Sequence, residues 1–215
     1  IIETQPTAQS GVIFFVFNMF NTSKWFKKFV MVTGFVAMGA SVGNIALAAP
    51  ADDVIFDMSQ KVLKDLKNNP GLRSGDKQTV SNYVDANIMP RVNFARWVAS
   101  SVGPAWNKAT PAEQNELMQV LRRYFVSTYS KDLVDNRVTA IDVYPAKGNQ
   151  VKTIVKTPSS QSTVIYYMEN SGGWRVYDMA IGGVKVSNTY RGQFKNTVNR
   201  GGVPALIAEL KAKTK

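Results

Sequence analysis

The sequence of 215 residues contains neither cysteine nor histidine. Without these side chains the chain cannot form a disulfide, a thiolate or imidazole zinc site, or a catalytic triad built on histidine. An enzyme of this composition would have to use carboxylates, lysine, serine or tyrosine. The Gly-rich phosphate-binding motifs and the calcium-binding EF-hand loop are absent as well. We therefore expect no cofactor and no metal ion.

Acidic residues are scarce: the chain has 15 Asp and Glu but 26 Lys and Arg, which gives a formal net charge of +11. The basic residues are scattered along the chain, and no RNA-recognition signature accompanies them. This pattern argues against a nucleic-acid partner. A basic protein of this kind more plausibly meets anionic lipid head groups or acidic partner surfaces.

The N-terminal part resembles an export signal. A segment with three lysines precedes an uncharged apolar run, and small residues then lead to an Ala-x-Ala site. These three parts predict a signal peptide over residues 19–49, cleaved after Ala48 or Ala49, and a protein of the periplasm. A membrane anchor is the minor alternative, because Gly and Asn interrupt the run. Residues 1–18 are interpreted as an upstream extension from a start-site artefact, and residues 50–215 as a single domain.

Helical spacing dominates both ends of this domain. Apolar residues recur at three- and four-residue steps, which is typical of amphipathic helices. Thr110, Pro111 and Glu113 together predict a helix start with a capping box. The predicted helices cover about residues 51–67, 76–90, 91–102, 110–134, 188–198 and 203–213.

Between the helical regions, polar and apolar residues alternate with a period of two. Four such segments, at about residues 138–144, 151–157, 163–169 and 174–181, are rich in Val, Ile, Tyr and Thr and are separated by short turns. They predict an antiparallel meander. Because strands and helices are segregated along the chain, we predict an α+β fold: a twisted four-stranded antiparallel sheet with helices packed on one face.

Paired carboxylates are the one acid–base device that the composition leaves open. Asp142, Glu169 and Asp178 are the candidates, and a carboxylate-dependent hydrolase is therefore an alternative function. Asp178 lies among apolar residues of a predicted strand, where an unpaired carboxylate would be costly to bury. We expect a structural ion pair between Asp178 and Arg191 rather than catalysis.

The C-terminal third carries a family resemblance. A strand ending in Val-Tyr-Asp at residues 176–178 is followed by a Gly-Val step and by Asn-x-Tyr-Arg-x-Gln-Phe at residues 188–194. The tail Gly-Gly-x-x-Ala-Leu-Ile-x-x-Leu-Lys then covers residues 201–211. These motifs, in this order, resemble the MlaC (toluene-tolerance) family. Weaker matches at residues 94–96 and 106–129 extend the resemblance over the whole exported domain.

The resemblance implies both a fold and a function. The MlaC family supplies the periplasmic phospholipid-binding component of the Mla ABC transport system. The resemblance implies a cone-shaped fold like that of nuclear transport factors, with a deep apolar pocket for acyl tails. It also implies a shuttle that maintains outer-membrane lipid asymmetry, with two partners: an outer-membrane lipoprotein–porin complex and an inner-membrane ABC transporter with MCE domains. We expect a monomer.

Large apolar side chains of the long helix, the short helices and the strands are the candidate lipid-binding residues. A shift of one residue on a strand would exchange Ile165 and Tyr167 for Val164 and Tyr166. A cell-envelope interaction domain with a filled core and no ligand remains a second alternative to the lipid carrier. The candidates are Ile88, Val92, Trp97, Leu121, Phe125, Tyr129, Ile141, Val143, Ile165, Tyr167, Tyr177, Met179 and Ile181.

Overall fold

The structure is a computed structural model that describes residues 50–130 and 138–214. The predicted signal peptide and upstream extension lie outside these residues. The elements are α1 (Ala51–Asn68), α2 (Pro70–Arg73), α3 (Lys77–Tyr83), η1 (Val84–Ile88), η2 (Met89–Arg91), α4 (Phe94–Val102), η3 (Gly103–Lys108), α5 (Pro111–Tyr129), β1 (Ala140–Val143), β2 (Gln150–Lys156), β3 (Gln161–Asn170), β4 (Trp174–Ile181), β5 (Val184–Lys185) and α7 (Val186–Lys213).

Polar caps fix where the helices begin. Asn69 accepts hydrogen bonds from the backbone N–H groups at the start of α2, and Asp76 accepts one from Thr79 at the start of α3. Thr110 and Glu113 form the predicted capping box of α5, in which each side chain bonds the other residue's backbone N–H. α5 is described as far as Tyr129, so the predicted extension to residue 134 lies outside the described residues.

The predicted second helix changes its geometry along its length. α3 continues into η1, one turn of π-helix, and then into η2, a 3₁₀ turn that contains Pro90. A π-helical turn has a wider hydrogen-bond pattern than an α-helix and is frequently found at functional sites. The segment between α3 and α4 is therefore irregular rather than a uniform helix.

The sheet is fully antiparallel, with strand order β1-β2-β3-β4-β5. The α+β class and the four predicted strands are confirmed, and the structure adds a fifth strand, β5, of two residues. The turn before β5 consists of Gly182 and Gly183, with φ of 55° and 87°. Positive φ at both central residues is the geometry that lets a two-residue hairpin follow the twist of its strands.

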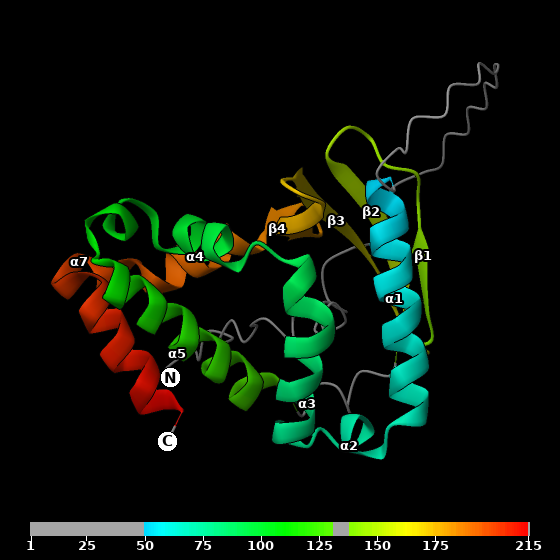
Figure 1. Cartoon of the computed structure of the whole chain (residues 1–215), viewed down its shortest axis with the longest axis horizontal. Coiled ribbons are helices and arrows are strands. Elements are labelled where there is room, and N and C mark those ends of the chain that lie inside the picture. The colour runs from blue at the N-terminus through cyan, green and yellow to red at the C-terminus, as the bar shows by residue number, and fades with distance from the viewer. Residues whose placement is uncertain (1–49, 131–137, 215) are drawn as a thin grey trace, which may run out of the picture.

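The helices form two groups around the sheet (Figure 1). α1 lies along β1 and β2, whereas α4, α5 and α7 pack against one another at the other end, where α4 and α7 contact β4. α7 covers both predicted C-terminal helices, and the predicted break between them is present as non-helical backbone at Gly201 and Gly202. In the part of the chain that the structure describes, no helix has the length and apolar character needed to cross a membrane.

Candidate functional site in the apolar interior

One face of the sheet is turned toward the helices and is called the inner face here. The strand register places alternate residues of neighbouring strands opposite one another on this face, for example Val151 and Met179 on either side of Tyr166. Val151, Val164, Met168 and Met179 are all fully buried. The inner face comprises Ile141, Val143, Val151, Thr153, Val155, Val164, Tyr166, Met168, Val176, Met179 and Ile181.

The predicted face of β3 is wrong by one residue. Val164 and Tyr166 are buried, at 0% and 4% exposure, whereas Ile165 and Tyr167 are half-buried on the opposite, outer face. The run of five residues from Val164 to Met168 is apolar or aromatic on both faces of the strand, so alternation alone does not distinguish them. The buried residues of β3 are thus Val164 and Tyr166, the alternative expected for a shift of one residue.

The predicted placement of Tyr177 is wrong for a different reason. Tyr167 is paired with Asp178, but the next residue, Met168, is paired with Val176, so the register shifts and Tyr177 has no partner on β3. Such an irregularity breaks the period of two along the strand. The Tyr177 ring lies on the outer face, 6.2 Å from that of Tyr167, and the Arg96 guanidinium lies 3.6 Å from its centroid. Beyond the shift, Met179 is on the inner face as predicted.

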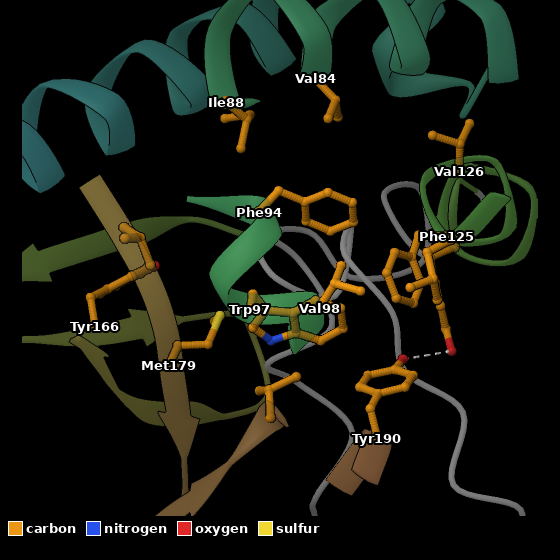
Figure 2. Close-up of a cluster of buried hydrophobic side chains, with 14 of the residues drawn as sticks. Val84, Ile88, Phe94, Trp97, Val98, Phe125, Val126, Tyr166, Met179 and Tyr190 are labelled. Carbon is orange, nitrogen blue, oxygen red and sulfur yellow. Dashed lines mark hydrogen bonds between the residues drawn. The ribbon is translucent and has the colours of Figure 1, made fainter. Parts of the chain in front are cut away.

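The helices bring an aromatic cluster to the same interior (Figure 2). Trp97 of α4 contacts Phe125 of α5 and Tyr190 of α7, with ring centroids 5.6 and 5.4 Å apart. The hydroxyl groups of Tyr129 and Tyr190 lie 3.4 Å apart and share a buried hydrogen bond. Burial raises the pKa of the Tyr190 hydroxyl far above its ordinary value.

The candidates predicted on helices lie in or against this interior. Ile88, Trp97, Leu121, Phe125 and Tyr129 are buried, and Val92 packs against the core beside β4. The strand candidates Ile141, Val143, Met179 and Ile181 also line the inner face or pack against the core. The list of candidates missed Phe94, Val126 and Tyr190, which are buried among the same side chains. The sequence does contain a signal for Tyr190, because this residue begins the helical spacing of apolar residues that continues through Phe194.

Enclosure of the interior is uneven. Trp97 and Phe125 have no solvent exposure, whereas Val84, Phe94 and Val126 keep 7%, 8% and 8%. Figure 2 shows Val84 pointing from η1 toward Phe94, with Val126 on the neighbouring α5.

The predicted ion pair between Asp178 and Arg191 is not formed. Asp178 is 3% exposed and accepts hydrogen bonds from the Ser187 hydroxyl at 2.6 Å and from the backbone N–H groups of Met179 and Ser187. Arg191 instead donates from Nε to the carbonyl oxygen of Ser100, at 3.0 Å. Three donors at the β4–α7 connection are enough to satisfy the buried carboxylate, so it needs no cation.

The other two carboxylates of the hydrolase alternative have separate partners. Asp142 pairs with Lys156 at 2.6 Å across β1 and β2. Glu169 accepts a hydrogen bond from Asn93 and pairs with Arg96, and these contacts lower the pKa of its carboxyl group. Among residues 50–130 and 138–214, no group of three acidic side chains is arranged to hold a metal ion. Each carboxylate is engaged in its own structural contact.

Sequence comparison identifies the family. The family model described as "MlaC protein" matches residues 57–212, well over half of the chain. The chain belongs to the MlaC family. Its characteristic C-terminal residues form β4, the Gly182–Gly183 turn, β5 and α7, where Asp178 and Ser187 are hydrogen-bonded.

Named members of the MlaC family resemble the chain over most of its length. "Toluene tolerance protein ttg2D" of Pseudomonas putida is 25% identical over 185 residues, which cover 80% of this chain and 85% of the relative. "Intermembrane phospholipid transport system binding protein MlaC" of Haemophilus influenzae is 24% identical over 215 residues, covering 90% and 94%.

A solved structure shares the MlaC fold. The phospholipid-binding protein of Ralstonia solanacearum, determined in complex with a phospholipid, is 30% identical to this chain and superposes with a TM-score of 0.71. The match covers 77% of this chain and 97% of the Ralstonia protein. The match therefore includes nearly the whole of the Ralstonia protein.

Proposed function

We propose that this protein is a periplasmic phospholipid carrier of the Mla system, which moves phospholipids between the outer and inner membranes and so maintains outer-membrane lipid asymmetry. The observation that carries the proposal is the fold shared with a phospholipid-bound protein over 97% of that protein's length. The inner face and the aromatic cluster supply an apolar interior of the kind that such a ligand needs.

Acyl tails suit this interior because its walls are almost entirely hydrocarbon. Each buried methylene contributes about 0.8 kcal/mol, so a chain of about 16 carbons gains roughly 12 kcal/mol before the costs of binding. That energy makes free diffusion of a phospholipid through water negligible, and a soluble carrier has to enclose the tails. We expect little head-group selectivity from the scattered basic residues, and no bond making or breaking.

Transfer requires two membrane partners. We propose the outer-membrane lipoprotein–porin complex and the inner-membrane MCE-domain ABC transporter, on the basis of family membership. A carrier with tightly held tails releases them only if a partner stabilises an opened form of the interior. Residues 50–215 contain 23 Lys and Arg and 14 Asp and Glu, and this net charge of +9 favours acidic partner surfaces.

Native mass spectrometry of protein purified from the periplasm of a Gram-negative host tests the proposal. We expect stoichiometric phospholipid on the unmodified protein. Val126→Trp adds bulk inside the interior and should reduce co-purified lipid, while Thr128→Trp places the same side chain on the exposed side of α5 and should not. Circular dichroism and thermal unfolding establish that both variants fold.

Other outcomes would support the alternatives. A well-folded, lipid-free protein would contradict the carrier and favour the interaction domain with a filled core. Lysophospholipid and free fatty acid that accumulate with the protein, and disappear in Asp178→Asn, would favour the carboxylate-dependent hydrolase.

A further inference from the structure

The outer face of the sheet has a row of paired residues with a lysine at each end. The strand register aligns one residue from each of β2, β3, β4 and β5 across this face. In strand order, the row consists of Lys152, Ile165, Ala180 and Lys185. Two positive charges therefore flank an apolar centre on the side of the sheet that faces away from the interior.

The carboxylates of the strands leave both lysines of the row without an ionic partner. Asp142 pairs with Lys156, and Glu169 pairs with Arg96. Asp178 is buried, and the hydrogen bonds described above satisfy its oxygens. Among the described residues, neither lysine of the row belongs to an ion pair. The outer face therefore carries positive charge that the protein itself does not neutralise.

Each lysine of the row lies over a tyrosine ring. Lys185 Nζ is 4.3 Å from the ring centroid of Tyr167, and Lys152 Nζ is 5.0 Å from that of Tyr144. The Tyr144 side chain keeps 40% of its surface exposed. A cation–π contact holds an ammonium group in place but uses none of its hydrogen-bond acceptors' positions, and lysine has three N–H donors. Both lysines are thus positioned and still able to bind an anion.

A groove lies at the Lys152 end of the row. It has a volume of about 440 Å³ and runs between the loop that follows β1 and the outer face of β2 and β3. A third lysine, Lys147, borders it together with Lys152. The residues that line the groove are Tyr144, Pro145, Ala146, Lys147, Gln150, Lys152 and Ile165. Basic side chains thus surround a mainly apolar groove.

The chemistry of these side chains matches an anionic membrane surface better than a protein surface. Lysine is depleted at protein–protein interfaces, where arginine is the enriched cation. At the surface of a membrane, lysine reaches the phosphates of anionic lipids, and tyrosine places its amphipathic ring at the level of the head groups. The free cations of the row and the groove are all lysines, and a tyrosine is exposed beside them.

We propose that the outer face is a docking surface for membranes that contain anionic phospholipids. Lys147, Lys152 and Lys185 contact the phosphates of the head groups, and the Tyr144 ring lies among these head groups. The inference goes beyond the carrier function, because the outer face and the apolar interior lie on opposite sides of the sheet. Docking needs no lipid inside the protein, and it keeps the carrier at the membrane surface.

Co-sedimentation with sucrose-loaded vesicles tests the docking surface. We expect the protein to bind vesicles of phosphatidylglycerol mixed with phosphatidylcholine but not vesicles of phosphatidylcholine alone. Salt should weaken the binding, because it screens exposed charges. A basic residue close to an anionic surface raises the partition coefficient roughly fivefold, so Lys152→Gln with Lys185→Gln should lower it by about 25-fold at low ionic strength.

The matched control removes the same charge from another surface. Lys64 and Lys67 are exposed on α1, and Lys64→Gln with Lys67→Gln should lower the partition coefficient by no more than about twofold. Equal losses in the two double variants would show that net charge alone attracts the protein, and would overturn the docking surface. Absence of binding to the phosphatidylglycerol vesicles would overturn it as well.

Polyglutamate distinguishes a membrane from an acidic protein. We expect it to bind no more weakly to the variant with Lys152→Gln and Lys185→Gln than to the variant with Lys64→Gln and Lys67→Gln. Saturable binding of polyglutamate that is lost only in the outer-face variant, together with unchanged binding to vesicles, would assign this face to an acidic protein partner and overturn the proposal.

A fluorescent label shows which face meets the membrane. The chain contains no cysteine, so Gln150→Cys introduces a single thiol at the groove, which an environment-sensitive dye can label. Gln60→Cys, on the exposed side of α1, is the control. Phosphatidylglycerol vesicles should shift the emission of the dye to the blue at position 150 but not at position 60. The reverse result would overturn the assignment of the face.

Co-purified phospholipid separates the docking surface from the carrier function. The variant with Lys152→Gln and Lys185→Gln should retain the phospholipid of the unmodified protein while it loses binding to vesicles. If the unmodified protein carried no phospholipid but still bound the vesicles through its outer face, the carrier function would fail and the docking surface would stand.

Discussion

The two faces of the sheet carry similar side chains in different surroundings. On the inner face, Tyr166 and Met168 are buried against apolar neighbours. On the outer face, Tyr167 and Tyr177 contact cations instead: Lys185 Nζ lies 4.3 Å from the Tyr167 ring centroid, and Arg96 lies over Tyr177. The comparison shows that composition does not determine which face becomes the dry interior. The helices that cover one face, and the cations that cover the other, make the difference.

A carboxylate introduced on each face in turn should give the largest difference in stability between the two faces. Val164→Asp introduces a carboxylate at a fully buried inner position, and we expect it to lower the free energy of unfolding by about 4 kcal/mol or to prevent folding. Ile165→Asp, on the outer face, should cost about 1 kcal/mol because water still reaches that side chain. Urea unfolding of both variants measures the difference, and similar losses would mean that both faces are buried alike.

The buried tyrosine should make the inner face sensitive to alkali. Burial raises the pKa of Tyr166 to about 12, above its ordinary value of 10. A raised pKa means that the folded state holds the proton more tightly, so its contribution is present below pH 10 and lost as the pH rises toward 12. Tyr166→Phe should remove this component, on the order of 2 kcal/mol, and make the alkaline loss of stability shallower.

Stability curves from pH 8 to pH 12 test this effect, with Tyr167→Phe on the outer face as the matched control. An unchanged alkaline slope in Tyr166→Phe would show that the Tyr166 hydroxyl is solvated in the folded protein.

The ionic contact at the end of the outer face should give the smallest effect. Glu169 receives a hydrogen bond from Asn93 and pairs with Arg96, which lowers the pKa of its carboxyl group. A lowered pKa contributes stability above about pH 4.5, and this contribution is lost as the pH falls through the folded-state value. We expect Glu169→Gln to cost about 1 kcal/mol at pH 7 and to flatten the acid limb of the stability curve.

Glu116→Gln serves as the comparison, because it disrupts an ion pair whose two side chains are 45% and 50% exposed. Its cost should fall within about 0.5 kcal/mol. If thermal unfolding gave equal losses for the two variants, Glu169 would contribute no more than an ordinary surface pair.

Elements whose sequence specifies a local geometry could be predicted well. The capping box at Thr110 and Glu113 and the break at Gly201 and Gly202 each follow from residues close together in the chain. The segregation of helices from strands likewise predicts the α+β class. These features depend on backbone conformation and on local hydrogen bonds, which the sequence encodes directly.

Placement of the candidate residues depended on contacts that the sequence does not encode locally. The face of β3 is ambiguous because Val164 and Ile165 are both apolar, and the register shift beside Tyr167 changes the face of Tyr177. The partner of Asp178 was mistaken because a nearby hydroxyl, that of Ser187, satisfies the carboxylate before any cation is needed. A single residue's face or partner is decided by tertiary packing.

The simple strand order has a consequence for the order of folding. Every strand pairs with its neighbour in the chain, so each step of sheet assembly closes only a short loop and can occur within microseconds to milliseconds. α1, by contrast, contacts β1 and β2, which follow it by about 70 residues. We therefore expect the sheet to form first and α1 to dock late. During that interval the inner face near β1 and β2 is uncovered, and the newly made chain is most vulnerable to aggregation.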